Sequence, residues 1–254
     1  MVQDTLSAPD YKPKKTTDTN VNVSYLGHLE TWYVTQSFPA GSSRATNDTC
    51  IDLIFKKGET CGWEFNSDWT NGFFPLDSFV NPNNIQLFIS TSKDSGYYHN
   101  YYFTMEMHVQ FVYRKGFDYK VYAGGDDDAW VFINNRLAID LGGISPGAEG
   151  PSYLDSMETD LGLIDGNKYA MDIFHAERCP TTSNFRIVTS MDIYSPDSVT
   201  GVQMQRPLRK CSIKQAGLII PMRAVSGKYY SINGQKISRK NISHQPLVKV
   251  QGSK

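Results

Sequence analysis

Short hydrophobic runs separated by turn-forming residues are the main pattern of this chain. Apolar and polar positions alternate most clearly over residues 101–113 and 117–122, which is typical of half-buried antiparallel strands. Further β-type runs, separated by Gly, Asn, Asp and Pro, occupy residues 31–34, 51–55, 85–89, 130–133, 137–141, 169–174 and 185–194. No amphipathic helix longer than about three turns is evident. The pattern therefore predicts an all-β fold, an antiparallel β-sandwich.

Charge divides the chain near residue 197. Residues 201–254 hold 11 of the 25 Lys and Arg residues and none of the 26 Asp and Glu residues. We therefore predict a flexible lead-in over residues 1–20, a β-sandwich over 21–197 and a small basic β module over 198–254. Within the last part, the Asn233-Gly234 pair between two β-type runs indicates a hairpin. This module either contacts surface or export machinery or is a solvated segment without a partner.

Composition excludes several classes of protein. A hydrophobic fraction of 40% with 13% aromatic residues excludes wholesale disorder. No apolar run approaches the roughly 18–20 residues of a transmembrane segment. Nucleic-acid binding is not expected, because the acidic first 200 residues would repel phosphate. The first residues do not resemble a signal peptide, so the chain is either cytosolic or lacks its export segment.

The chain contains four cysteines, Cys50, Cys61, Cys179 and Cys211. Cys50 and Cys61 flank a short turn-like segment and could form a local disulfide, which would leave Cys179 to pair with Cys211. The spacing does not match a structural zinc site. Four free thiols are the alternative. Disulfides form in oxidising compartments, and we favour the interpretation that the protein is secreted or displayed at the cell surface.

Three adjacent carboxylates, Asp126, Asp127 and Asp128, carry the strongest chemical signal. They follow Gly124-Gly125 and directly precede the apolar run at residues 129–133. Adjacent carboxylates repel one another, and Ca²⁺, which takes about six to eight oxygen ligands, would neutralise them. A solvated acidic loop is the alternative. The segment 174–185 is predicted to be a loop at the same end of the sandwich, so its amide and carbonyl oxygens could complete a calcium site with room for a ligand's hydroxyl groups.

These segments resemble a known family. Residues 125–134, the stretch Ile139-Asp140-Leu141-Gly142-Gly143 and the stretch His175-Ala176-Glu177-Arg178 are similar to the fibro-slime domain of secreted bacterial and amoebal proteins. That domain is in turn similar to the protective-antigen-type, jelly-roll-like β-sandwich of yeast flocculins and related adhesins. The resemblance spans roughly residues 50–194. It departs from the family after Gly143, where a His is usual and this chain has Ile144 followed by Ser145.

The resemblance implies a calcium site and a carbohydrate partner. In the lectin members an Asp-Asp pair with a cis peptide bond, an Asn and loop carbonyls hold Ca²⁺, which then binds sugar hydroxyls. Here the pair would be Asp126 and Asp127, with Asp128 as the other candidate metal ligand and Asn184 as the amide ligand. Glu177 and Arg178 would line the ligand-binding site beside them.

We therefore expect a secreted, calcium-dependent carbohydrate-binding or adhesion module, with plant cell-wall polysaccharide as the ligand class that the resemblance favours. The alternative is a structural matrix or surface protein that binds other proteins and uses calcium only for rigidity. Asp126 and Glu177 could also be read as a glycosidase carboxylate pair. Isolated acidic residues are too common to carry that interpretation, so we predict no enzyme and no catalytic residues.

Overall fold

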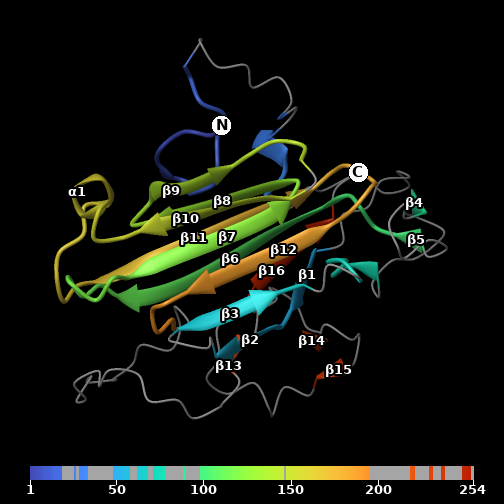
Figure 1. The fold of residues 1–254 in the computed structure, drawn as a ribbon. Coiled ribbons are helices and arrows are strands. Elements are labelled where there is room, and N and C mark those ends of the chain that lie inside the picture. The colour runs from blue at the N-terminus through green and yellow to red at the C-terminus, as the bar shows by residue number, and fades with distance from the viewer. Residues whose placement is uncertain are drawn as a thin grey trace.

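A computed structural model describes residues 1–18, 26, 29–33, 48–57, 62–67, 71–77, 98–145 and 147–194, together with strands at 88–89, 218–220, 229–230, 236–237 and 248–252. The described elements are almost entirely β (Figure 1). The strands are β1 (Asp48–Ile51), β2 (Leu53–Lys57), β3 (Trp63–Asn66), β4 (Phe88–Ile89), β5 (Tyr98–His99), β6 (Phe103–Val112), β7 (Lys120–Asp126), β8 (Asp128–Ile133), β9 (Arg136–Leu141), β10 (Ala148–Tyr153), β11 (Lys168–Glu177), β12 (Asn184–Thr189), β13 (Leu218–Ile220), β14 (Tyr229–Tyr230), β15 (Lys236–Ile237) and β16 (Val248–Gly252). One short helix, α1 (Glu158–Leu161), and a 3₁₀ turn, η2 (Leu29–Thr31), accompany them.

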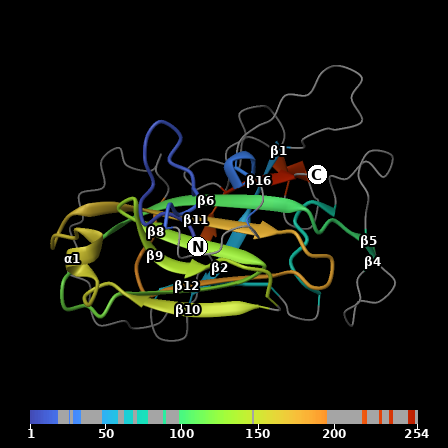
Figure 2. The ribbon, with the colours of Figure 1, turned by 90° about the horizontal axis from the view of Figure 1, so that it is seen from above.

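Two sheets pack face to face as a sandwich. The eight-stranded sheet has the order β15-β14-β1-β16-β6-β11-β8-β9, and the six-stranded sheet has the order β10-β7-β12-β3-β2-β13. Nearly all neighbouring strands are antiparallel, and Figure 2 shows the two layers from above. The predicted all-β antiparallel sandwich is therefore confirmed.

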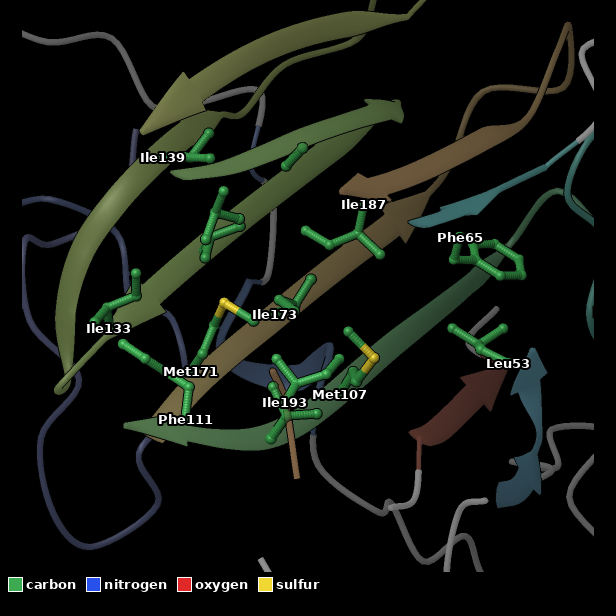
Figure 3. Packing of buried hydrophobic residues seen from close by; sticks show 14 of the residues in the cluster. Leu53, Phe65, Met107, Phe111, Ile133, Ile139, Met171, Ile173, Ile187 and Ile193 are labelled. Carbon is green, nitrogen blue, oxygen red and sulfur yellow. The ribbon is translucent and has the colours of Figure 1, made fainter. Parts of the chain in front are cut away.

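Alternation along the strands builds the core between the sheets. On β6 the inward side chains include Met107 and Phe111, and on the neighbouring β11 they include Met171 and Ile173. Figure 3 shows these side chains in one cluster with Ile187 and Phe65, which come from the other sheet. Each fully buried side chain of this kind contributes about 1.5–3 kcal/mol to the free energy of unfolding.

The first residues of the chain form part of the fold. Val2 and Leu6 are buried in a second hydrophobic cluster on the outer face of the eight-stranded sheet, together with Trp130, Phe132 and Phe174. The Leu137 N–H donates to the Asp4 carbonyl over 2.8 Å. This packing of residues 1–18 differs from the flexible lead-in that the sequence predicted over residues 1–20. Two buried apolar side chains anchor this otherwise polar segment, and the average composition of the segment does not reveal them.

The C-terminal strands extend the same two sheets. β16 lies between β1 and β6, with Val250 opposite Met105, and β13 pairs with β2. β14 and β15 pair antiparallel, as expected for the two arms of the predicted hairpin. This placement differs from the expectation of a separate module over residues 198–254, because the described strands of that part are hydrogen-bonded into the sandwich.

Candidate cation-binding site

The Asp triplet and the 174–185 segment meet at one end of the sandwich. β7 ends at Asp126 and β8 begins at Asp128, while β11 ends at Glu177 and β12 begins at Asn184. Asn184 is the register partner of Asp126 across β12 and β7. The Asp126–Asp127 peptide bond is cis, as the resemblance implied. The structure thus brings together the residues that the sequence had placed on two separate loops.

Close packing behind the site requires a glycine before the triplet. A Cβ atom at Gly125 would lie 2.9 Å from the Ala129 Cβ and 3.2 Å from the His175 Nδ1. The His175 Nδ1–H donates to the Asp128 carbonyl over 3.0 Å. Burial lowers the pKa of His175 to about 4, although this hydrogen bond opposes the shift. His175 is therefore a neutral, buried support beneath the carboxylates.

Asp126 and Asp127 are buried, and one oxygen of Asp127 has no hydrogen-bond partner among the described residues. The Thr182 hydroxyl donates to Asp126, and the Arg178 backbone N–H donates to Asp127 Oδ2 over 3.0 Å. Asp127 Oδ1, Glu177 Oε2 and Asn184 Oδ1 are buried oxygens that have no hydrogen-bond partner within bonding geometry among the described residues, although the Ser145 N–H and the Ser183 hydroxyl lie near enough to lower the pKa of Asp127 and of Glu177. Leaving such atoms unsatisfied costs about 1–3 kcal/mol each, and more when they are charged. Oxygen acceptors without donors fit a bound cation, which binds oxygen lone pairs directly.

Burial makes the ionised forms of the carboxyl groups at the site unfavourable. Burial, with a further contribution from the Asp127 charge, raises the pKa of Asp126 to about 7. Burial and the neighbouring Asp127 raise the pKa of the Glu177 carboxyl to about 11. Burial raises the pKa of Asp127 as well, although the Arg178 N–H opposes that shift. Within the described part of the chain, the neighbouring groups therefore do not fully offset the cost of ionising these carboxyl groups.

Asp128 has a different role from its two neighbours. Its Oδ2 accepts from Arg178 Nε over 2.6 Å, and its Oδ1 accepts from the Gly143 N–H over 2.6 Å and from Arg178 Nη2 over 3.3 Å. Donors of the protein contact both oxygens of Asp128, so Asp126 and Asp127 are the less engaged carboxylates of the triplet, and the assignment of Asp128 as a metal ligand stays a prediction. Among the described residues no three His, Cys, Asp or Glu side chains are grouped to hold a metal ion. A cation here would therefore rely on two carboxylates and on neutral oxygens.

The remaining candidate residues have the following positions. Arg178 lies at the site, but its side chain is directed to Asp128. Cys179 forms no disulfide with another described cysteine. Cys61 and Cys211 lie outside the described residues, and only the backbone of Cys50 is described, so the proposed disulfides remain predictions.

Sequence reasoning did not identify Thr182, Gly143 or His175 as part of the site. The hydroxyl of Thr182 could have been considered, because it falls in the loop already expected to complete the site. Gly143 contributes through its backbone N–H, and residue identity carries no signal for that contact.

A two-sheet β-sandwich with buried carboxylates and open acceptor oxygens at one strand end defines a β-sandwich binding domain. Residues 56–201, more than half of the chain, match the PA14 domain, and the chain belongs to the PA14 domain family. PA14 domains are often carbohydrate-binding or adhesion modules, and the fold agrees with that general class.

Similar proteins occur in Dictyostelium discoideum. Protein psiQ is 39% identical over 131 residues, which are 50% of this chain and 13% of psiQ. Protein psiJ is 41% identical over 152 residues, 56% of this chain and 19% of psiJ, and protein psiB is 37% identical over 152 residues, 58% of this chain and 25% of psiB. The chain therefore spans a quarter or less of these relatives. No solved structure matches the chain. None of the helices in the described part is long and apolar enough to cross a membrane.

Proposed function

We propose that this chain is a secreted, calcium-dependent module that binds carbohydrate and serves adhesion. The observation that carries the proposal is the pair of buried oxygens, Asp127 Oδ1 and Asn184 Oδ1, that have no hydrogen-bond partner among the described residues and lie at the cis Asp126–Asp127 pair. Ca²⁺ prefers carboxylate, amide and carbonyl oxygens, which are the groups gathered here. Membership of the PA14 domain family supports the same class of function.

Each residue of the site has a specific part in this proposal. Asp126 and Asp127 supply the negative charge, and Asn184 supplies a neutral amide oxygen. The Thr182 hydroxyl fixes the orientation of the Asp126 carboxyl. A bound Ca²⁺ would supply positive charge and coordination positions for the hydroxyl groups of a sugar. Glu177 and Arg178 flank the pair and would contribute to the walls of the ligand site.

Calorimetry tests the cation site directly. Titration of Ca²⁺ into the wild-type protein should give a single binding event, which Asp127→Asn should weaken at least about tenfold because it removes one charged ligand. Asp160→Asn, in the exposed α1 at a distance from the triplet, is the matched control and should bind as the wild type does. Indistinguishable heats for the wild type and Asp127→Asn would eliminate the proposed site.

A glycan array tests the ligand class. We expect a calcium-dependent signal, and the resemblance to the fibro-slime domain predicts plant cell-wall polysaccharides as its source. The second candidate function is that of a structural extracellular protein that binds other proteins. A silent array together with a calcium-raised melting temperature would favour that function. Release of reducing sugar from the bound polysaccharide would instead indicate a glycosidase, and we expect none.

A further inference from the structure

Arg178 and Asp128 form an ion pair adjacent to the candidate cation site. The Asp128 carboxylate is fully buried and the Arg178 side chain is 17% exposed. The guanidinium approaches both carboxylate oxygens, at 2.6 Å and 3.3 Å, and the Gly143 N–H completes the coordination of Asp128 at 2.6 Å. This pair therefore joins the start of β8 to the loop after β11 and to the loop after β9.

Arg178 also contacts the Asp126–Asp127 carboxylate pair through its backbone. The Arg178 N–H donates to Asp127 Oδ2 over 3.0 Å, which leaves Oδ1 as the atom of that carboxylate without a protein donor. Four residues further along, Thr182 donates to Asp126. One end of the loop is thus fixed to Asp127 and Asp128, and its other end is fixed to Asp126.

Trp32, in the segment 29–33, packs over this ion pair. The Arg178 guanidinium lies over the Trp32 ring at 5.4 Å, and the Trp32 ring lies 6.5 Å from that of Trp130. The Trp32 carbonyl accepts from the Thr104 hydroxyl over 2.7 Å, which fixes the Trp32 backbone against β6. Trp32 precedes the part of the chain that matches the PA14 domain. An element outside the matched domain therefore contacts a residue that binds Asp127.

We propose that Arg178 is a positioning residue for the cation site, that Asp128 holds it in place and neutralises its charge, and that Trp32 packs over it. This inference rests on the proposed function. A free guanidinium next to a divalent cation would repel it, and the Asp128 carboxylate offsets that repulsion. The planar fork of Arg matches a carboxylate in a way that Lys cannot, so the identity of the residue matters as well as its charge.

The two possible roles of Arg178, as a positive charge and as a positioning residue, predict opposite changes in Ca²⁺ affinity, so the inference can be tested. If Arg178 acted only as a nearby positive charge, Arg178→Gln would tighten Ca²⁺ binding and Arg178→Lys would leave it unchanged. If Arg178 positions the loop, both variants should weaken Ca²⁺ binding by about tenfold or more. A merely structural role would lower the melting temperature of the calcium-free protein without changing the Ca²⁺ dissociation constant.

The experiment is a Ca²⁺ titration of the full chain by calorimetry, with thermal unfolding of each variant recorded without calcium. Arg186→Lys is the matched control. Arg186 pairs with the Glu64 carboxylate at 3.0 Å and lies over the Tyr122 ring at 5.2 Å, so its contacts resemble those of Arg178. It lies on the outer face of the six-stranded sheet. The Ca²⁺ dissociation constant of this variant should stay within about twofold of the wild-type value. Trp32→Ala should weaken binding less than Arg178→Gln.

The outcomes separate the inference from the function on which it rests. If the wild type binds Ca²⁺ and Arg178→Gln has an unchanged or lower Ca²⁺ dissociation constant, the positioning role alone is overturned. No Ca²⁺ binding by the wild type overturns the proposed function and the positioning role together. If Arg178→Gln does not unfold cooperatively, Arg178→Lys, which keeps the charge, decides the question in the same way.

Discussion

Leu6→Ala tests whether the first 18 residues contribute to the stability of the sandwich. The Leu6 side chain is 5% exposed and packs in the cluster that contains Trp130, Phe132 and Phe174. Its N–H also donates to the Asn135 carbonyl over 2.8 Å, a bond that the substitution retains. Truncation of a buried Leu to Ala costs about 2–5 kcal/mol, through lost transfer free energy and the cavity left behind. We expect a value near 2–3 kcal/mol, because a segment close to a chain end relaxes more easily than a central strand.

Urea denaturation followed by tryptophan fluorescence measures this loss. The midpoint should fall while the slope with urea stays at the wild-type value, since the folded and unfolded states keep their surface areas. Ile164→Ala is the matched control, because that side chain is 62% exposed and its truncation should change the free energy of unfolding by no more than about 0.5 kcal/mol. A Leu6→Ala effect as small as that of the control would refute the packing of the N-terminal segment.

Three further predictions follow from the described contacts. Burial alone would raise the pKa of Glu106, but His108, whose Nε2 lies 3.8 Å from Glu106 Oε2, and the Lys12 charge lower it to about 2 from 4.5. The resulting stabilisation is complete above about pH 4.5 and is lost as the pH falls towards 2, so Glu106→Gln should be less stable than the wild type by about 1–3 kcal/mol at pH 7. That gap should narrow in acid, and a gap independent of pH would contradict the ionised state. Gly125→Ala should lower the free energy of unfolding in urea by about 1–3 kcal/mol, because the added Cβ overpacks the site. Gly150→Ala, whose Cβ would lie 3.5 Å from its nearest neighbour, should be nearly neutral. Equal effects of the two substitutions would count against the close approach at Gly125. In a peptide map under non-reducing conditions a Cys179–Cys211 cross-link would support the disulfide predicted from the cysteine pattern, and complete alkylation of Cys179 would contradict it.

The sequence predicted the fold where the pattern was periodic. Strict alternation over β6 and a continuous apolar run over β8 are direct consequences of which faces are buried, so they could be read without a structure. The Asp triplet could be recognised because uncompensated adjacent carboxylates are unfavourable wherever they are buried. The proximity of Asn184 to Asp126 followed from the expected loop over residues 174–185 and from the resemblance to a known family.

The contacts that distinguish the three Asp residues could not be predicted in this way. Asp126, Asp127 and Asp128 are the same residue type in consecutive positions, and only the three-dimensional position of Arg178 shows which of them is paired. The N-terminal segment was assigned to a flexible lead-in because burial of Val2 and Leu6 depends on an apolar outer sheet face formed by distant residues. Burial on that face is a tertiary property, and a local composition does not report it.

A crystal structure of the protein grown with millimolar Ca²⁺ tests the central claim most directly. We expect one ion bound by oxygens of Asp126, Asp127 and Asn184, with metal–oxygen distances of about 2.3–2.6 Å, and with Asp128 still paired to Arg178. Water molecules at hydrogen-bonding distances of about 2.8 Å from these oxygens, with no ion at saturating calcium, would contradict the account.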